Sequence, residues 1–322
     1  MKIALIIVYF GNFPEYFPAF LKSAATNQDF DFLIYSDNSY NQELLPNNVK
    51  IINSDFEILK SQIQKLFDFK ISLSKPYKLT DFKPVYGQIF ESEIKDYTHW
   101  GYFDLDIILG DLIQFVTLSD LSNFDKIGGR GHLSIFKNNE KNRLAYRRVI
   151  GKNAFQFDEA LSNRYSYHFD EMWGINSVYA TSDFKFKDDE DIPYFDASPK
   201  RYPLISVRGN ELKKPSVVLW EDGKLYLNGE KEKQLAYIHL QKRKIKYYSE
   251  RNLTSNQMLI DQNSIISGPT FDQYDIQKRI QAQKKKWPEG ELHHLFKYYY
   301  NTIVSGEQFS RIKLIKKRFL LK

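Results

Sequence analysis

The chain has no cysteine among its 322 residues, which excludes disulfide bridges, zinc–thiolate sites and cysteine nucleophiles. Long hydrophobic runs are also lacking. The longest is Ile3–Phe10, far short of the roughly 20 residues that span a bilayer. Lys2 is the only cation before this run, and no small-residue cleavage site follows it, so it is a poor signal peptide. We expect a buried first strand in a cytoplasmic protein.

The body of the chain has no surplus of positive charge. Residues 271–322 hold twelve Lys/Arg and five Asp/Glu, a net of +7 against +6 for the whole chain, which leaves a net of −1 for the first 270 residues. An enzyme that acts on nucleic acid more often spreads positive charge over its core. We therefore expect no nucleic-acid partner. DNA binding by the basic tail alone is the alternative.

Neither a G-x-G-x-x-G fingerprint nor a P-loop sequence is present, so neither mode of nucleotide binding is supported. The apolar periodicity predicts an α/β protein. Strands are expected at 2–10, 31–36, 49–53, 99–110, 124–129 and 133–136, helices at 16–27, 56–67 and 81–94, and a hairpin at 217–229. The β-α-β-β-α order at the start favours a doubly wound sheet with a nucleotide site at its strand ends.

Two carboxylates interrupt an apolar strand at Asp104-Leu-Asp106. Burying an unpaired carboxylate is costly, and residues i and i+2 of a strand share a face. Asp104 and Asp106 are therefore candidates to hold a hard divalent cation such as Mn²⁺ or Mg²⁺ at a strand end. The alternative is a pair of ordinary turn carboxylates at the edge of a sheet.

The segment Gly101-Tyr-Phe-Asp-Leu-Asp106 resembles the D-x-D segment of glycosyltransferases with the GT-A fold. The helix-like stretch Pro76–Pro84 before it resembles the Asp-x-x-Arg helix of retaining bacterial glycosyltransferases related to families 8 and 32. Asp81 matches the Asp of that pattern, whereas Lys83 stands only two residues further on, which departs from it. The resemblance covers roughly residues 1–250 and points to proteins of capsule and exopolysaccharide clusters. It implies a GT-A-like, Rossmann-type mixed sheet flanked by helices.

A histidine near the end of this region is the third candidate metal ligand. His239 closes an apolar stretch and is followed by four cations within five positions, beginning at Lys242. A neutral imidazole can complete an oxygen-rich metal site, and cations beside it can neutralise a diphosphate. The resemblance implies these roles for His239 and Lys242. A surface turn with a solvated basic run is the alternative.

The end of the first strand and the turn after the second lie where a GT-A fold binds a nucleoside. Gly11 would let the backbone approach a base, and Asp37 could accept hydrogen bonds from ribose or uracil. With Tyr9 and Phe10, and with Asp81 and Lys83 from the upstream helix, these residues form the predicted donor-binding set. Ordinary turn chemistry is the competing interpretation.

Two segments are candidates for binding the acceptor. The glycine-dense stretch 128–137 would allow a close backbone approach, and Asp170, Glu171 and Trp173 stand together in the segment 167–176. An aromatic face commonly stacks on a sugar, and a carboxylate beside it could bind hydroxyls or act as a base. Asp170 and Glu171 are therefore the candidate catalytic residues, with a helix cap and a surface charge as the alternative.

These observations together favour a metal-dependent hexosyltransferase. It would move a hexose from a UDP-sugar to a hydroxyl of a lipid-linked oligosaccharide or other glycan in bacterial surface polysaccharide synthesis, and the resemblance implies retention of configuration. A non-catalytic nucleotide- or carbohydrate-binding relative is the main rival. A metal-dependent phosphatase or nucleotidyltransferase is another, although such enzymes usually show more clustered Asp/His ligands.

The C-terminal tail predicts contact with a membrane. Residues 311–322 carry six cations, no acidic residue and six apolar residues, and Ile312, Ile315, Phe319 and Leu320 fall near one stripe of a helix. A basic amphipathic helix suits an anionic membrane surface. We therefore expect a catalytic domain at 1–250, a helical basic extension at 251–322, and attachment to the inner face of the plasma membrane. Docking of the stripe on the catalytic domain is the alternative.

Overall fold

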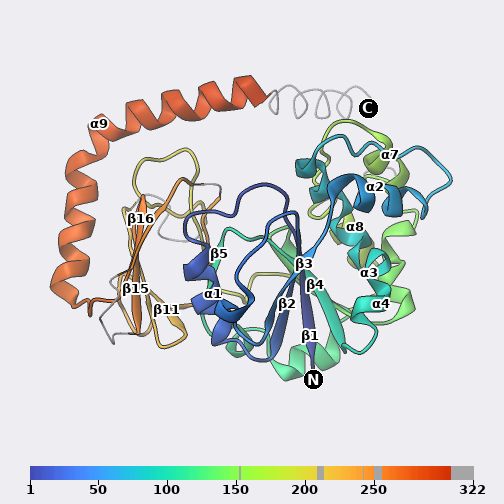
Figure 1. Cartoon of the computed structure of the whole chain (residues 1–322), viewed down its shortest axis with the longest axis horizontal. Coiled ribbons are helices and arrows are strands. Elements are labelled where there is room, and N and C mark those ends of the chain that lie inside the picture. Colours follow the sequence, from blue (N-terminus) through green and yellow to red (C-terminus); the bar gives the residue numbers. More distant parts are fainter. Residues whose placement is uncertain (152–153, 209–213, 242, 250–255, 306–322) are drawn as a thin grey trace.

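The described residues form three β-sheets, short helices and a long C-terminal helix in this computed structural model (Figure 1). The structure describes residues 1–151, 154–208, 214–241, 243–249 and 256–305. The tail at 311–322, whose amphipathic character is predicted above, and the candidate Lys242 lie outside the described residues.

The first sheet has seven strands in the order β3-β2-β1-β4-β7-β6-β8. The four strands β3, β2, β1 and β4 run parallel, and β7 pairs antiparallel with β4. The strands are β1 (Ile3–Val8), β2 (Phe30–Ser36), β3 (Val49–Asn53), β4 (His99–Phe103), β6 (Lys126–Arg130), β7 (Leu133–Lys137) and β8 (Phe186–Lys187). The sheet is therefore mixed, with its parallel part at the N-terminus as predicted.

Both faces of this sheet are covered by helices. Residues Ile3, Leu5 and Ile7 of β1 belong to one apolar cluster with helix α1 (Phe17–Ala25). The alternate residues of β1 belong to a second cluster with α2 (Phe56–Gln64). Because successive strand residues point to opposite faces, an uninterrupted apolar strand has to be buried on both sides.

The prediction of one continuous helix over 81–94 is wrong, because the segment is divided into shorter helices. A 3₁₀ helix covers Pro76–Val85, and two short α-helices follow it, α3 (Tyr86–Ile89) and α4 (Glu91–Ile94). Pro84 lies inside the 3₁₀ segment and has no N–H to donate, which disfavours a continuous α-helix there. Other short helices in the described residues are α5 (Leu118–Asn123), α6 (Glu140–Arg143), α7 (Phe157–Ser162) and α8 (Ile175–Tyr179). Further 3₁₀ turns lie at Gln42–Leu44, Leu112–Gln114 and Ala145–Arg147.

The single strand predicted over 99–110 is also wrong, because it is two strands in different sheets. Residues 104–106 separate β4 from β5 (Ile107–Leu109). Strand β5 belongs to a three-stranded sheet with β13 (Tyr237–His239) and β9 (Tyr194–Asp196). The two carboxylates thus lie where the chain crosses from one sheet to the other.

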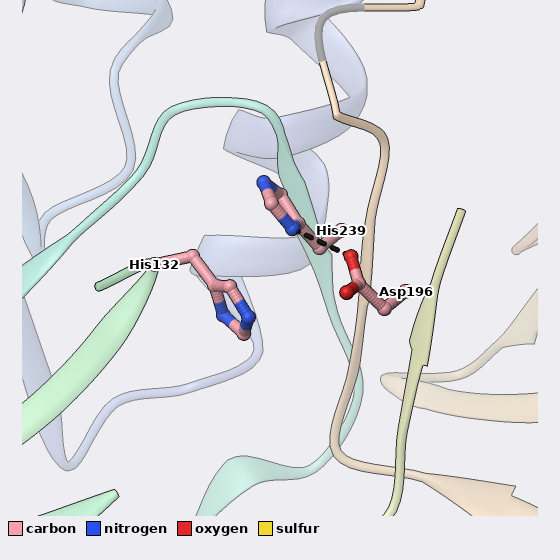
Figure 2. Close-up of side chains that lie close together, drawn as sticks. All are labelled: His132, Asp196 and His239. Carbon is pink, nitrogen blue, oxygen red and sulfur yellow. Dashed lines mark hydrogen bonds and ion pairs between the residues drawn. The ribbon is translucent and has the colours of Figure 1, made fainter. Parts of the chain in front are cut away.

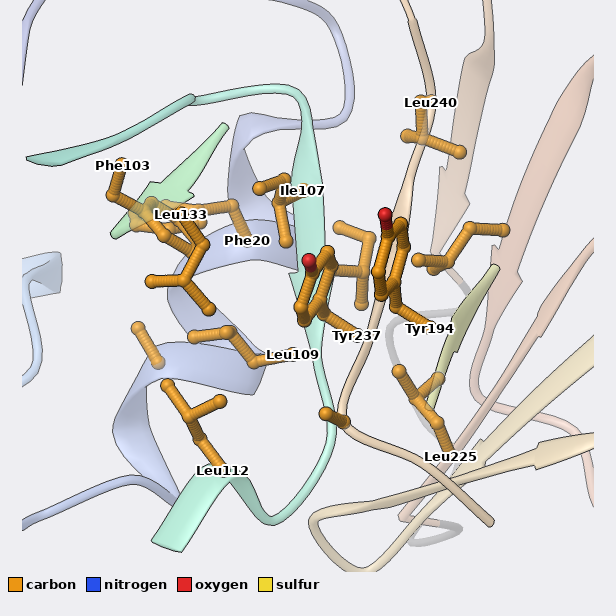
Figure 3. Packing of buried hydrophobic residues seen from close by; sticks show 14 of the residues in the cluster. Phe20, Phe103, Ile107, Leu109, Leu112, Leu133, Tyr194, Leu225, Tyr237 and Leu240 are labelled. Carbon is orange, nitrogen blue, oxygen red and sulfur yellow. The ribbon is translucent and has the colours of Figure 1, made fainter. Parts of the chain in front are cut away.

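A third sheet completes the core. It has the order β12-β11-β10-β15-β16-β14. The strands are β10 (Val218–Glu221), β11 (Lys224–Leu227), β12 (Gln234–Leu235), β14 (Lys246–Ser249), β15 (Gln257–Ile260) and β16 (Ser264–Ser267). The predicted hairpin is confirmed as β10–β11, with a turn at Asp222 and Gly223. One apolar cluster continues from α1 through β5 and β13 into this sheet (Figure 3).

Helix α9 (Gln273–Ser305) covers the third sheet with its first turns. Ile276 and Ile280 pack with apolar residues of this sheet, among them Leu219 and Leu259. Residues 257–267, which the sequence assigned to the extension, form two strands of this sheet, so the helical part of the extension begins only at Gln273. The boundary at residue 250 between a catalytic domain and a C-terminal extension stays a prediction.

The fold class predicted from the sequence is confirmed. The protein is α/β, with a Rossmann-type mixed sheet flanked by helices and a helical C-terminal segment. Among the described helices, none has the length and apolar content needed to cross a bilayer.

Candidate functional site

The site lies where strands β4 and β13 end and strand β5 begins. Asp104 directly follows β4, Asp106 directly precedes β5, and His239 is the last residue of β13. In the pairing of β13 with β5, His239 is opposite Ile107, the neighbour of Asp106. In the pairing of β13 with β9, His239 is opposite Asp196. The register of the small sheet therefore sets one imidazole between two carboxylates.

Asp104, Asp106 and His239 converge, although His239 is distant from the other two in sequence. One potential ligand atom from each lies within 4.8 Å of the others. His239 Nε2 is 3.4 Å from Asp106 Oδ1, and its Nδ1 is 2.9 Å from Asp196 Oδ1. The structure thus brings together the three residues that the sequence nominated as metal ligands.

The surroundings of His239 favour its doubly protonated, positively charged imidazole in the metal-free protein. Burial alone would lower its pKa, but the charge of Asp106 and the hydrogen bonds to Asp106 and Asp196 outweigh burial and raise the pKa to about 10. Asp196 also accepts a hydrogen bond from Gln241 Nε2 at 2.6 Å, which holds the carboxylate in place. A metal at this site would have to displace the proton on Nε2.

Lys83 stands behind the carboxylates as an internal cation. Its Nζ lies 2.6 Å from Asp104 Oδ1 and 3.5 Å from Asp170 Oδ2, and it donates to the backbone carbonyl of Gly131 at 2.8 Å. Burial opposes its charge, but Asp104 and Asp170 outweigh burial and raise its pKa. Lys83 therefore ties the D-x-D turn, the β6–β7 turn and the segment of Asp170 together.

The two candidate catalytic carboxylates lie beside this lysine. Asp170 is buried, and burial, reinforced by the charge of Glu171, raises its pKa despite the attraction of Lys83. Glu171 Oε1 accepts the backbone N–H of Gly131 at 3.0 Å. A Cβ on Gly131 would lie 2.1 Å from Asp170 Oδ2, so only glycine permits this close approach.

Asp81 lies behind the site rather than at its surface. Its side chain is fully buried, and its oxygens accept the backbone N–H groups of Tyr167 and Phe169 at 3.0 and 2.9 Å. Lys78 Nζ pairs with it at 2.5 Å. Both oxygens are thus engaged within the protein, and Asp81 anchors the segment that leads into Asp170.

The predicted nucleoside-binding residues form the neighbouring edge. Gly11 has a φ of 96°, a backbone conformation that favours glycine, and its N–H donates to Asp37 Oδ1 at 3.0 Å. Tyr9 is half-buried, and burial, reinforced by the charge of Asp106, raises its pKa. Phe10 packs edge-on against Phe56.

Sequence reasoning missed two residues of the site, His132 and Asp196. His132 lies in the turn between β6 and β7, its carbonyl accepts the N–H of Asp104 at 3.1 Å, and its ring centroid is 4.4 Å from that of His239 (Figure 2). His132 falls inside the glycine-dense segment 128–137, which the sequence predicts as an acceptor-binding stretch and not as a metal site. Asp196 lies in a turn-rich region without a motif, so only the β9–β13 pairing reveals it.

The residues present fit a divalent cation. Two carboxylates and one imidazole are a donor set that Mn²⁺ accepts, and Asp196 on the far nitrogen of His239 supplies the outer partner that metal-bound histidines usually have. Asp104 and Asp106 remain 33% and 20% exposed, so an ion and its ligand can reach them. The fold and this site define an α/β protein with a candidate carboxylate–histidine metal centre at the carboxyl ends of its parallel strands.

The chain belongs to the family described as "Family of unknown function (DUF6625)", whose model matches residues 5–269. No curated protein matches the sequence.

Several solved structures align with part of the chain. The galactosyltransferase LgtC, in a complex with donor and acceptor sugar analogues, is 12% identical with a TM-score of 0.34, over 62% of this chain and 77% of LgtC. The glycosyltransferase GlyE of Streptococcus pneumoniae TIGR4, in its apo form, is 10% identical with a TM-score of 0.33, over 59% of this chain and 46% of GlyE. Protein A197 of STIV is 10% identical with a TM-score of 0.27, over 58% of this chain and 81% of A197.

Proposed function

We propose that this protein is a metal-dependent glycosyltransferase that moves a hexose from a UDP-sugar to a hydroxyl of a glycan. The convergence of Asp104, Asp106 and His239 at the carboxyl ends of the parallel strands carries the proposal. Ligands of open α/β sheets bind at such strand ends, and a carboxylate-rich cluster there suits the metal of a nucleotide diphosphate. The D-x-D segment that resembles GT-A transferases is part of this cluster.

The donor would bind across the nucleoside edge and the metal centre. Asp37 and Gly11 are exposed at that edge, and the charge of Asp106 contributes to the raised pKa of Tyr9 there. Asp104, Asp106 and His239 would hold Mn²⁺ or Mg²⁺, which when bound offsets the negative charge that develops on the leaving diphosphate. Lys242 remains proposed as a further cation on that diphosphate.

The acceptor would bind on the side of Asp170 and Glu171. Trp173 is 50% exposed and Met172 is 58% exposed in the same turn, so an aromatic face and an apolar contact are available to a sugar ring. Glu171 holds the N–H of Gly131 and would orient an acceptor hydroxyl, while buried Asp170 positions Lys83. Retention of configuration is proposed on the family resemblance alone.

The acceptor is proposed to be lipid-linked, in the synthesis of a capsular or other surface polysaccharide, with the enzyme peripheral at the inner face of the plasma membrane. Helix α9 supports this placement because it exposes one apolar stripe, in which Leu292, Phe296 and Tyr300 are 75%, 76% and 61% exposed at a spacing of i, i+4 and i+8. The stripe precedes the basic segment 311–322 in sequence. Apolar side chains followed by cations suit an anionic lipid surface.

A non-catalytic relative that only binds nucleotide or carbohydrate is the second candidate. Lys83 pairs with Asp104 and protonated His239 lies against Asp106, so the carboxylates are already neutralised by internal cations. A protein that never binds a metal could retain such a self-neutralised cluster.

Two assays test the proposal in sequence. A thermal-shift panel of nucleoside diphosphates, each with and without Mn²⁺, should show stabilisation by UDP that depends on the metal, because a ligand of the folded state raises the melting temperature. UDP-sugars are then incubated with the enzyme without acceptor, and slow release of UDP is expected of a transferase. Metal-dependent binding without any release would favour the non-catalytic relative, and the absence of metal-dependent binding would contradict the proposal.

A further inference from the structure

His132 is a buried histidine whose polar atoms have no partner within the part of the chain that the structure describes. Its side chain is 5% exposed, and neither Nδ1 nor Nε2 has a hydrogen bond there. Its ring is enclosed by those of Tyr194, Tyr237 and His239, with centroids 5.2, 5.5 and 4.4 Å away. Leaving buried donors or acceptors unpaired is costly, so an unpaired buried imidazole points to a ligand.

Two further ligand groups stand beside this ring. One potential ligand atom from each of His132, Asp196 and His239 lies within 4.8 Å of the others (Figure 2). Tetrahedral zinc with bonds of about 2.0 Å holds its ligands about 3.3 Å apart, so a modest rotation of the rings would close the site. Asp196 and His239 each keep 12% exposure, which leaves an approach for a cation from their side.

We propose that His132, Asp196 and His239 form a second cation site that prefers Zn²⁺ over Mn²⁺. Two imidazoles and one carboxylate make a donor set richer in nitrogen than the D-x-D cluster, and imidazole nitrogen favours zinc whereas carboxylate oxygen suits manganese and magnesium. Neither ring nitrogen of His132 has a hydrogen bond among the described residues, so one of them can offer its lone pair to a cation.

The two sites share His239 and therefore exclude one another. A neutral imidazole has one lone pair and one N–H. Zinc at Nδ1, the nitrogen that faces Asp196, leaves the proton on Nε2, where it points at Asp106. Nε2 then cannot complete the Mn²⁺ centre. The zinc site is inferred from the distances and burial given above. The antagonism between zinc and Mn²⁺ rests in addition on the proposed function.

The test begins with Zn²⁺ alone and the full-length, metal-free protein. X-ray absorption of the zinc complex should show two imidazoles per zinc, whereas zinc on Asp104, Asp106 and His239 would show one. His132→Phe removes a zinc ligand and keeps an aromatic ring. Because it replaces two unpaired buried nitrogens by carbon, we expect the variant to fold. Its affinity for zinc in a calorimetric titration should fall by at least about tenfold, as metal affinity does when a site loses a partner.

The matched control is His294→Gln, which removes a histidine outside the proposed site whose Nε2 pairs with the carbonyl of Pro199. It should leave the zinc affinity unchanged. One imidazole per zinc in the unmodified protein, or equal affinities in His132→Phe and the unmodified protein, would overturn the site.

A second measurement separates this inference from the proposed function. One equivalent of Zn²⁺ should weaken Mn²⁺-dependent UDP binding in the unmodified protein but not in His132→Phe. If zinc binds through two imidazoles while UDP never binds with Mn²⁺, the zinc site stands and the proposed function fails. If UDP binds with Mn²⁺ and the zinc spectrum shows one imidazole, the proposed function stands and the zinc site fails.

Discussion

Lys83 Nζ lies 2.6 Å from Asp104 Oδ1, and this ion pair joins the 3₁₀ helix of Pro76–Val85 to the D-x-D turn. The lysine side chain is 10% exposed and the aspartate 33%. Asp170 Oδ2 lies 3.5 Å from the same ammonium group, so one lysine side chain contacts both carboxyl groups.

Replacing this lysine should destabilise the fold. Lys83→Met leaves Asp104 and buried Asp170 without their shared cation, and breaking a buried ion pair costs on the order of 3 kcal/mol; we take the lower end of the range because Asp104 is partly exposed. Urea unfolding of the metal-free protein measures the change. Lys50→Met, on the exposed side of β3, is the control and should alter stability by less than about 0.5 kcal/mol. Equal stabilities of the two variants would refute the role of Lys83.

The raised pKa of His239 predicts a pH dependence of stability. The pKa is about 10 in the folded protein against an ordinary value of 6.5. The protonated ring therefore stabilises the metal-free fold fully below about pH 6.5, and this contribution is lost as the pH rises toward 10. His239→Gln should remove that part of the decline in the free energy of unfolding between these values. If the free energy of unfolding changes with pH in the same way in His239→Gln and in the unmodified protein, the ring does not gain a proton on folding.

The same proton should oppose metal binding. Mn²⁺ needs the lone pair of Nε2, so its affinity should rise by up to about tenfold per pH unit below the pKa. Calorimetric titrations of Mn²⁺ at pH 6 and pH 8 measure this. An affinity independent of pH would mean that the metal does not use His239.

The exposed stripe of α9 predicts lipid binding that depends on apolar contact. Phe296→Ser should weaken binding to anionic vesicles, because burying a phenylalanine side chain contributes about 1.5–3 kcal/mol. Vesicle sedimentation at low salt measures the effect. Tyr274→Ser removes another exposed aromatic at the opposite end of α9 and should bind as the unmodified protein does. Loss of binding to the same extent in both variants would argue against the stripe.

Removal of residues 311–322 tests the basic part of the same surface. The truncated protein should be released from anionic vesicles, because each cation near the lipid contributes on the order of 1 kcal/mol. Hydrolysis of the donor in solution should be unaffected. Unchanged vesicle binding after truncation would contradict the predicted role of the tail.

The sequence predicted those parts of the fold that depend on local pattern. The strands at Ile3–Val8, Phe30–Ser36 and Val49–Asn53 were predicted because each is nearly continuous in apolar residues and ends at a turn signal. The break at 104–106 was not predicted, because the change from one sheet to another depends on pairing with β13, a strand far along the chain. The strands at 257–267 were missed because no local signal showed that they pair with β10.

The site was predictable where a motif was present. Asp104 and Asp106 interrupt an apolar strand, and His239 ends one, so their chemistry was visible in the sequence. His132 and Asp196 stand in segments without such contrast, and they join the site only through the β6–β7 turn and the register of β9 with β13. Asp81 matched a motif, but its burial shows that it holds the backbone of Tyr167 and Phe169.

The most direct test of the metal site at Asp104 and Asp106 is calorimetry of UDP binding with and without Mn²⁺ in Asp104→Asn and Asp106→Asn. Both substitutions keep the shape of the side chain and remove the charge that would hold the cation, so the proteins should fold. We predict that Mn²⁺-dependent UDP affinity falls by at least about tenfold in both, while Asp111→Asn, beyond the other end of β5, binds UDP as the unmodified protein does. Unchanged Mn²⁺-dependent UDP affinity in both variants would contradict the metal site and the function proposed from it.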